Sequence, residues 1–539
     1  MAEPNNQPDK QTGKKRRWIL FLVLGVLFIT GSVMLYLIYN AEELAKDLLI
    51  EQLNEQLAPN AVIKIGEFSF SVHPTSITLN NVEIVHIKPF EEIEPVRKTD
   101  SILRFEFREA TVEGINLLRL ALRRQWSLGM FTVDGLHIET VPFPEDSGDK
   151  PEDPDYVFPL FVSEVTLKNS RFTSYRDREA TRFAYMADNF MGKLYNFSLS
   201  KADAPLHSYM DHVAITADTL GYMTDDELYE IFIINFETDS RAQALSFSKA
   251  EVIPQKTAKQ MAEKIGTQTD QFNIETGALK ATGFDIITWL KDEELKITSL
   301  IVDKPILHIN RDKSFPRADR GFRPLPPKQF IELPYGISID TLKMENATIR
   351  YVEKYPQDGR SGEISFYEVD VLAKKLQNRS DQDSIRVYVT ARFLNEVPIA
   401  VNYHFAVREN SGHAVSGHMG SFDLTLLNPV IENLAAKQIR SGMLDDFRFD
   451  FHANNYSSTG KLHMVYNNFE LRFLDEESLE ETRGRRLRSF LANRLKIRAA
   501  NSADDPRQGE IDFERDEERS IFNYWWKSVL SGIEDIVIR

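Results

Sequence analysis

The chain has 539 residues, contains no cysteine and carries a formal net charge of −16. Its length exceeds what one compact core usually holds, so several domains or an extended repeat architecture are expected. The acidic balance argues against a nucleic-acid-binding surface, which needs positive charge to meet phosphates. The lack of cysteine excludes disulfides, thiolate catalysis, cysteine-ligated zinc and iron–sulfur clusters.

An uncharged apolar run of 22 residues, Trp18 to Tyr39, directly follows four basic residues at 14–17. At about 1.5 Å per residue this run spans the roughly 30 Å hydrocarbon core of a bilayer. The positive-inside rule puts the tail 1–17 in the cytoplasm and the rest of the chain outside. A cleaved signal peptide is the alternative, but no small-residue cleavage pattern precedes Asn40. The sequence therefore predicts a transmembrane helix at 18–39.

Leucines at helical spacing predict an amphipathic connector helix over 40–60. Beyond residue 60 the hydrophobic period changes from 3.6 to 2, which predicts strands with one apolar and one wet face. The fold class is therefore expected to be mainly β, an elongated and curved antiparallel sheet with short helices. The alternating apolar positions are Phe68, Phe70, Val72, Phe105, Phe107, Val401, Tyr403, Phe405, Phe447, Phe449, Phe451, Phe469 and Phe473.

These apolar positions allow two interpretations. If one curved sheet leaves its apolar face open, the face forms a groove whose walls suit acyl chains. If a second layer covers that face, the same side chains form an ordinary packed β core. The groove is the preferred interpretation, and it makes the alternating residues candidates for contact with lipid.

The chain also contains an internal repeat. Gly114-Ile115-Asn116-Leu117-Leu118 returns 169 residues later as Gly283-Phe284-Asp285-Ile286-Ile287, and Val133-Asp134 returns at the same distance as Val302-Asp303. Both copies then pass through a proline-rich stretch and resume with Thr-Leu-Lys, at Thr166 and at Thr341. In each copy the glycine is expected to end a strand and open a short helix, at 117–124 and at 286–291. The repeat predicts growth by stacking of similar units.

The predicted divisions of the chain beyond the connector are a first β repeat at 61–230, a second at 231–382, a C-terminal β segment at 383–474 and a charged helical tail at 475–539. The C-terminal segment is expected to contain a helix over 424–438 that Ser441-Gly442 ends.

Two amphipathic helices are expected in the tail. The first covers 483–498 and contains only basic charges, so Arg485, Arg486 and Arg488 are candidates for contact with anionic headgroups or for a solvated face. The second covers 521–538 and contains Trp525 and Trp526, which are candidates for membrane or partner contact. The alternative for this second helix is that it caps an open end of the sheet.

No catalytic, metal-binding or cofactor-binding pattern stands out. The eleven histidines are scattered, and the chain has no glycine-rich phosphate loop, nucleophile elbow or His-Glu-x-x-His helix. The sequence therefore predicts no enzyme, no metal and no cofactor.

In the order of its parts the sequence resembles the AsmA-like family of bacterial envelope proteins, which includes TamB-like and YhdP-like members. The resemblance rests on the N-terminal anchor, the strand Phe131–Ile138, the phrase Val302-Asp303-Lys304-Pro305, and the Asn428-Pro429 helix before Ser441-Gly442-Met443-Leu444. It implies a taco-shaped β-groove that is rooted in the inner membrane and projects into the periplasm. It further implies that phospholipid moves along the groove in support of outer-membrane homeostasis, with no catalytic residues.

The expected function is accordingly a non-enzymatic binding protein of the cell envelope that handles phospholipid. The alternative is a structural tether or assembly factor with a packed β core. The expected partners are the inner membrane, phospholipid, and either another envelope protein or a second copy of the chain; no nucleic acid is expected.

Overall fold

The computed structural model describes residues 50–538 apart from 52–53, 55–56, 73–74, 94–100, 117–118, 120–125, 143–159, 200–204, 319–320, 355–360, 380–383, 407–411, 436 and 475–496. The predicted tail 1–17, the predicted transmembrane helix 18–39, most of the connector 40–60 and most of the predicted helix 117–124 therefore lie outside the described residues. Within the described part of the chain, no helix is both long and apolar enough to cross a membrane.

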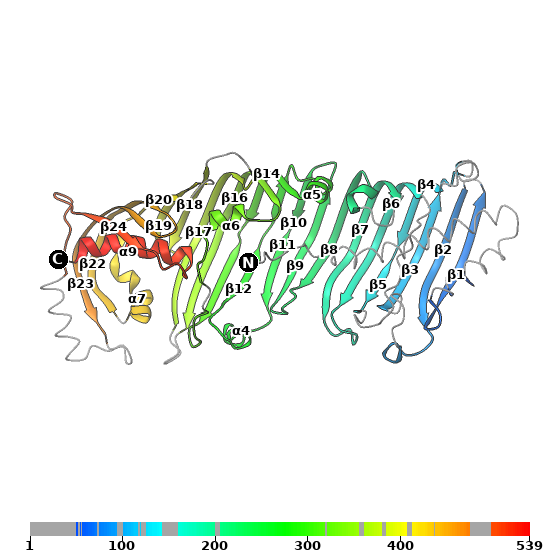
Figure 1. Ribbon diagram of the computed structural model, residues 1–539, viewed down its shortest axis with the longest axis horizontal. Helices are drawn as coiled ribbons and strands as arrows, with labels where there is room; N and C mark the ends of the chain where they lie inside the picture. The colour runs from blue at the N-terminus through cyan, green and yellow to red at the C-terminus, as the bar shows by residue number, and fades with distance from the viewer. Residues whose placement is uncertain are drawn as a thin grey trace, which may run out of the picture. The chain divides into compact units, whose positions relative to one another are not determined.

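The protein is mainly β, as predicted, and the chain divides into two compact units, Met1–Tyr222 and Met223–Arg539. In unit 1, each strand from β1 to β3 pairs antiparallel with the next, β3 pairs with both β4 and β5, and β6, β7 and β8 follow (Figure 1). β4 and β5 run parallel to β6, so the sheet is not purely antiparallel. The strands are β1 (Ala61–Val72), β2 (Thr75–His86), β3 (Ile102–Glu113), β4 (Trp126–Asp134), β5 (His137–Thr140), β6 (Leu160–Tyr175), β7 (Phe183–Leu199) and β8 (His212–Met223).

Unit 2 begins with the same kind of sheet and ends with long antiparallel strands. Its first part comprises β9 (Tyr229–Asp239), β10 (Ala244–Phe247), β11 (Lys249–Pro254), α4 (Ala258–Ile265), β12 (Asp270–Thr276), β13 (Leu279–Thr282), α5 (Ile286–Asp292), β14 (Glu294–Asp303), β15 (Ile306–Asp312) and α6 (Pro326–Ile331). Its second part comprises β16 (Gly336–Lys354), β17 (Ser361–Gln377), β18 (Ser384–Phe393), β19 (Val397–Ala406), β20 (His413–Met419), β21 (Phe422–Asp423), η4 (Leu424–Leu427), α7 (Asn428–Ala435), β22 (Lys437–Ala453), β23 (Ser457–Phe473), β24 (Gln508–Glu514) and α9 (Ile521–Val537).

Strand pairing in the two units reproduces the sequence repeat. Ile77 lies opposite Val112 in unit 1, and Leu245 lies opposite Ala281 in unit 2. β14 and β15 run parallel to β16, just as β4 and β5 run parallel to β6. In both copies the predicted glycine has a positive φ, +69° at Gly114 and +73° at Gly283. A side chain at Gly283 would clash with Thr298, because its Cβ would lie 2.2 Å from Oγ1.

One part of the repeat alignment needs correction. The Thr-Leu-Lys triplets suggest that Lys168 corresponds to Lys343. Backbone hydrogen bonds give a different match, because Gly135 N donates to Lys168 O while the equivalent Lys304 N donates to Glu345 O. The residue equivalent to Lys168 is therefore Glu345, two residues after Lys343. A shift of two keeps each side chain on the same face of a strand, so the apolar pattern hides it.

Asparagines interrupt the expected strict alternation inside the strands. Asn169 has a φ of +48° in the middle of β6, where the pairing with β7 shifts register on both sides of Ser170. Positive φ also occurs at Asn189 and Asn196 in β7 and at Asn346 in β16. Such irregular positions act as β-bulges, which bend a strand and increase its twist. They give the physical origin of the curvature that the sequence predicted only in outline.

The helices confirm some predictions and correct others. The predicted helix at 286–291 is α5, with Asp285 accepting a hydrogen bond from Ile287 N at its start. The helix predicted over 424–438 is instead the pair η4 and α7, and it ends at Ala435. Ser441 and Gly442 lie inside β22, so they do not end the helix. The tail predicted to be helical contains a strand, β24, before α9.

Candidate functional site

An unbroken apolar row crosses the sheet of unit 1. The registers of neighbouring strands place Ile77 opposite Val112, Val112 opposite Phe131, Phe131 opposite Val165, Val165 opposite Leu194, and Leu194 opposite Val213. We call these six side chains the unit 1 row. All are buried except Leu194, which is half-buried. A second row beside it joins Phe68, Leu79, Ala110, Val133 and Leu167.

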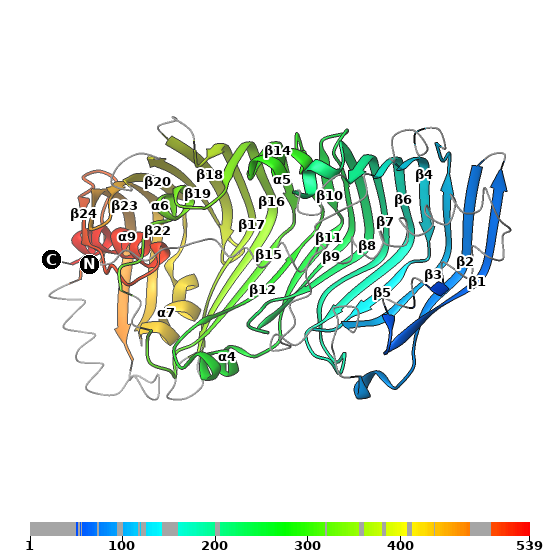
Figure 2. The ribbon, with the colours of Figure 1, turned by 45° about the vertical axis from the view of Figure 1, so that its right-hand side comes forward.

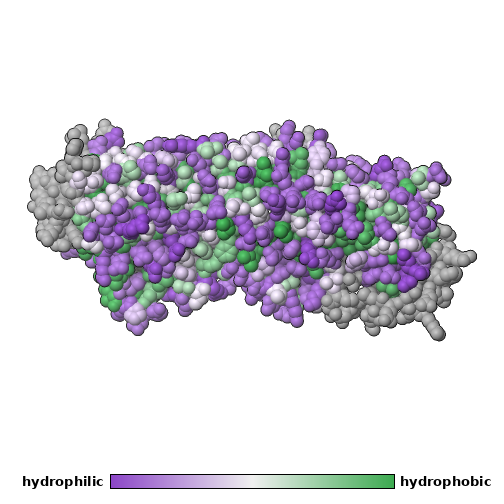
Figure 3. Space-filling view, turned by 180° about the vertical axis from the view of Figure 1, so that it is seen from behind, coloured by the Kyte–Doolittle hydropathy of each residue, from purple (hydrophilic) through white to green (hydrophobic). Residues whose placement is uncertain are grey.

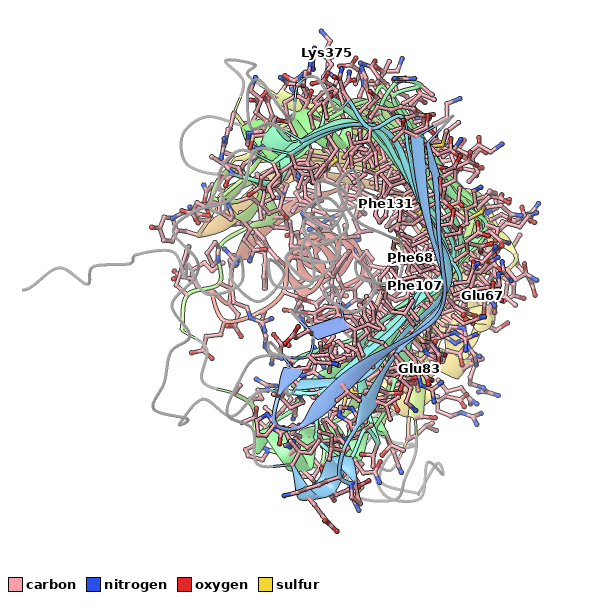
Figure 4. The ribbon with its side chains drawn as sticks, turned by 90° about the vertical axis from the view of Figure 1, so that its right-hand side faces the viewer. Glu67, Phe68, Glu83, Phe107, Phe131 and Lys375 are labelled. Atoms are coloured by element: carbon pink, nitrogen blue, oxygen red, sulfur yellow. The ribbon has the colours of Figure 1, made fainter. Side chains whose placement is uncertain are left out.

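The two sides of this sheet differ sharply in polarity. In Figure 4, Phe68, Phe107 and Phe131 project to the concave side, whereas Glu67 and Glu83 project from the convex side. Ion pairs link neighbouring strands on the convex side, among them Arg171 with Asp188 at 2.7 Å. Figure 3 shows the convex side as mainly hydrophilic. The sheet is therefore amphipathic as a whole, and its apolar surface lies on the inside of the curve.

A small polar network on the convex side centres on Asp134 at the end of β4. The carboxylate accepts hydrogen bonds from Arg108 on β3 and, at 2.8 Å, from the bulge residue Asn169 on β6. Partial burial acts to raise the pKa of Asp134, but the hydrogen bonds from Arg108 and Asn169 outweigh it and lower that pKa below its usual value. The network links β3, β4 and β6 at the bulge of Asn169.

Replacing Asp134 by Asn is expected to remove a pH-dependent part of the stability of unit 1. Because the pKa of Asp134 is lowered in the folded protein, its ionised form stabilises the fold above the ordinary value of 3.8. That contribution disappears as the pH falls below 3.8 through the lowered folded value. In urea unfolding, the wild-type protein should exceed D134N in stability at pH 6, and the gap should narrow towards pH 3. A gap that stays constant or widens in acid would contradict this account of the network.

The apolar face of β19–β24 in unit 2 is covered by other parts of the chain. Figures 1 and 2 show α9 lying across these strands, with α7 beside β22. Phe451 and Leu462 of the sheet are fully buried in one cluster with Tyr524 and Ile536 of α9. Leu325, from the segment between β15 and β16, is also fully buried in this cluster. This face is a packed core.

Close backbone contact and polar bonds hold α9 in place. Gly509 of β24 and Gly532 of α9 face each other so closely that a Cβ on Gly509 would lie 2.2 Å from Gly532 O. The hydroxyls of Ser458 and Ser528 lie 2.7 Å apart in the buried interface. Trp525 Nε1 donates to His413 Nε2 at 2.7 Å, and its ring packs on Tyr403. The helix is fixed in one position on the sheet by the small residues at the contact and by the buried polar pairs.

Arg515 connects several parts of this cover. It is 7% exposed, and its guanidinium donates to the backbone oxygens of Asn455 and Arg323. The rings of Phe322 and Tyr524 lie 5.7 Å from it, within cation–π range. Burial lowers the pKa of Arg515 and raises the pKa of Tyr524 to about 12. The cation thus joins the segment after β15 to the start of α9.

The predicted lipid-contact residues fall into two different environments. Phe68, Phe105 and Phe107 lie on the concave side of unit 1. The members from 401 to 469 belong to the core beneath α9 or pack against it: Val401, Tyr403, Phe405, Phe447, Phe449, Phe451 and Phe469. Phe473 lies at the end of β23 with Lys437 over its ring. The side chains of Phe70 and Val72 lie outside the described residues.

The two predicted contact residues of α9 also differ from each other. Trp525 is half-buried against Tyr403, whereas Trp526 is 57% exposed. Arg485, Arg486 and Arg488 lie outside the described residues. Sequence reasoning did not identify Leu325, Gly509 or Gly532, which decide how the core is closed. The spacing of Ile511 and Phe513 between acidic residues was the available signal for β24.

Within the described ranges, no group of His, Asp and Glu side chains could hold a metal ion. The chain matches no protein-family model, and no curated protein matches it. The concave side of unit 1 is apolar, and its convex side carries ion pairs.

Proposed function

We propose that the concave side of unit 1 binds the acyl chains of phospholipid, and that the chain acts as a non-enzymatic protein of the bacterial cell envelope. The observation that carries this proposal is the unit 1 row, in which one apolar side chain meets the next across six strands. At about 4.8 Å per strand the row extends over roughly 24 Å. That exceeds the acyl layer of one leaflet, which is about half of a 30 Å hydrocarbon core.

The helices described in unit 1 are short, and Leu194 of the row remains half-buried. η1 (Phe90–Glu92) has three residues and η3 (Leu206–Tyr209) has four. In unit 2, by contrast, the 17-residue α9 lies on the sheet. The apolar run at 18–39 supports the proposal from the sequence, because an anchor in the inner membrane would keep unit 1 beside its ligand. The resemblance to AsmA-like proteins also supports the proposed binding of phospholipid.

A structural tether or assembly factor is the second candidate function. The closed core beneath α9 favours it for the C-terminal part of unit 2, since a face filled by the protein's own helix has no room for a ligand. In this alternative, the curved sheet positions an envelope partner and carries no lipid.

Replacing Leu194 by Glu is expected to remove bound phospholipid while the protein stays folded. Leu194 is the half-buried member of the unit 1 row, so a charge placed there meets the ligand and not a sealed core. Lys193→Glu is the matched control, because Lys193 is exposed and has the opposite orientation on the same strand. The chain from residue 41 onwards is purified and its extracted lipid quantified by mass spectrometry.

The expected result is several phospholipids per chain for the wild type and K193E, and at least a tenfold loss for L194E. Circular dichroism and the melting temperature report whether each variant is folded. A folded wild-type protein without lipid would favour the tether. Equal lipid in L194E and K193E would place the lipid somewhere other than the unit 1 row.

A further inference from the structure

The last strand of unit 2 is protected at its outer edge. An edge strand presents unpaired backbone groups on the side away from its neighbour, and these groups readily pair with another chain. β24 avoids this through α9: Glu510 N donates to Asp535 Oδ2 at 3.0 Å, and Asp512 N donates to Ser531 Oγ at 3.3 Å. Side chains of the helix thus take the place of a further strand.

The first strand of unit 1 has no comparable protection in the described part of the chain. β1 pairs with β2 over its whole length of 12 residues. On its other edge the described contact is a single hydrogen bond from Ile63 N to Asn54 Oδ1 at 2.7 Å. Beyond Ile63, no described residue bonds to this edge. Figure 1 shows β1 as the outermost strand of its sheet.

Two copies of β1 are complementary in side-chain polarity and charge when they pair antiparallel. On the N-terminal side of Gly66, the odd-numbered residues Ile63 and Ile65 are buried and Lys64 is exposed. On its C-terminal side the alternation changes phase, so that Glu67 is exposed and Phe68 is half-buried. A second β1 placed antiparallel with Ile65 opposite Gly66 therefore brings Ile63 opposite Phe68 on the concave side. The same register brings Lys64 opposite Glu67 on the convex side, twice by symmetry.

Charge favours this register. Lys64 lies 4.0 Å from Glu83, and Glu67 accepts a hydrogen bond from Asn80 at 3.4 Å, so both charges are held only loosely within their own chain. Both are also exposed, and Glu67 projects from the convex side, as does Glu83, the partner of Lys64 (Figure 4). Opposite charges directly across an antiparallel pair are stabilising, and like charges are destabilising.

We infer that β1 is a dimerisation edge, at which a second copy of this chain adds its own β1 in antiparallel orientation. The contact would be isologous, because each copy contributes the same strand. Main-chain hydrogen bonds would supply the affinity, and the Lys64–Glu67 pairs would fix the register. Since α9 blocks β24, addition stops at two copies. The inference stands without the lipid function.

The test is the mass of the full-length chain in detergent micelles, measured by native mass spectrometry and by sedimentation. The wild type is expected to be a dimer. Lys64→Glu places like charges opposite one another and should weaken the dimer at least tenfold. The charge swap K64E/E67K restores opposite charges in the same register and should restore the dimer. A monomeric wild type at tens of micromolar, or a swap variant as weak as K64E, would overturn the inference.

Cross-linking tests the register directly, because the natural chain has no cysteine. In K64C/E67C each new thiol faces one on the other copy, whereas three residues of extended strand separate the two thiols of one chain by about 10 Å, too far to bridge. Oxidation should therefore give a covalent dimer. N80C/E83C has the same spacing on β2, whose two edges are occupied by β1 and β3, and it should stay monomeric. Equal cross-linking in both variants would contradict the proposed edge.

Discussion

Phe451→Lys is expected to unfold the C-terminal part of unit 2. Phe451 is fully buried among the apolar side chains of β22, β23 and α9. A lysine there must either bury an unpaired charge or force the helix away, and the loss of packing alone costs about 3–5 kcal/mol. The change should lower the melting temperature sharply and abolish the near-ultraviolet dichroism of the aromatic core.

Two variants separate this effect from a general sensitivity of β22. Phe451→Leu keeps an apolar side chain of similar volume and should cost less than about 2 kcal/mol. His452→Lys places a lysine one residue later, on the exposed side of the strand and opposite the uncharged residues Thr459 and Ala414, and should have little effect. If F451K remained as stable as H452K, the face beneath α9 would be open in solution.

Gly532→Leu is expected to release α9 from the sheet. A Cβ at this position would lie 2.8 Å from Leu462 Cβ and 2.9 Å from Ile511 Cγ1, before the rest of a leucine side chain is added. Overpacking of this kind commonly costs about 1–3 kcal/mol, and here the helix can relieve it only by moving outwards. Trp525 would then lose its contacts with Tyr403 and His413, and its fluorescence should shift to the red.

Release of α9 should have a second consequence at the edge of the sheet. Asp535 and Ser531 would no longer cover the amides of β24, so G532L is expected to aggregate through this edge. Lys527→Leu is the matched control, because Lys527 lies on the exposed side of the same helix. Limited proteolysis should cut within α9 in G532L and spare it in K527L. Equal resistance of both would show that the close contact does not hold the helix.

Several features of the fold could be predicted from the sequence because they depend on local pattern. Period-2 alternation predicted strands such as β3 and β22, and Gly283 predicted the strand end and the short helix α5 that follows. The repeat could be found because both copies need a glycine of positive φ at the same turn. These signals act over a few residues, and tertiary contacts did not override them.

Other features depend on contacts between distant residues. The alternation of Phe447, Phe449 and Phe451 shows that one side of β22 is apolar, but it does not show what covers that side. The cover comes from α9, about 80 residues later, and from Leu325, more than 100 residues earlier. From the sequence alone, Asn169 is typical of a loop, because its hydrogen bond to Asp134 exists only in the folded sheet. The alternation of apolar residues alone could therefore not decide whether an apolar face is an open groove or a packed core.

The proposed function implies a contrast: the apolar side of unit 1 should contact lipid, and the apolar side beneath α9 should not. A photoreactive amino acid placed in the full-length chain, in cells, tests both halves of it at once. At position 194, in the unit 1 row, irradiation should give a phospholipid adduct that mass spectrometry identifies. At position 193, on the convex side, and at position 451, beneath α9, it should give none. An adduct at 451 as abundant as at 194, or no adduct at 194, would contradict the account.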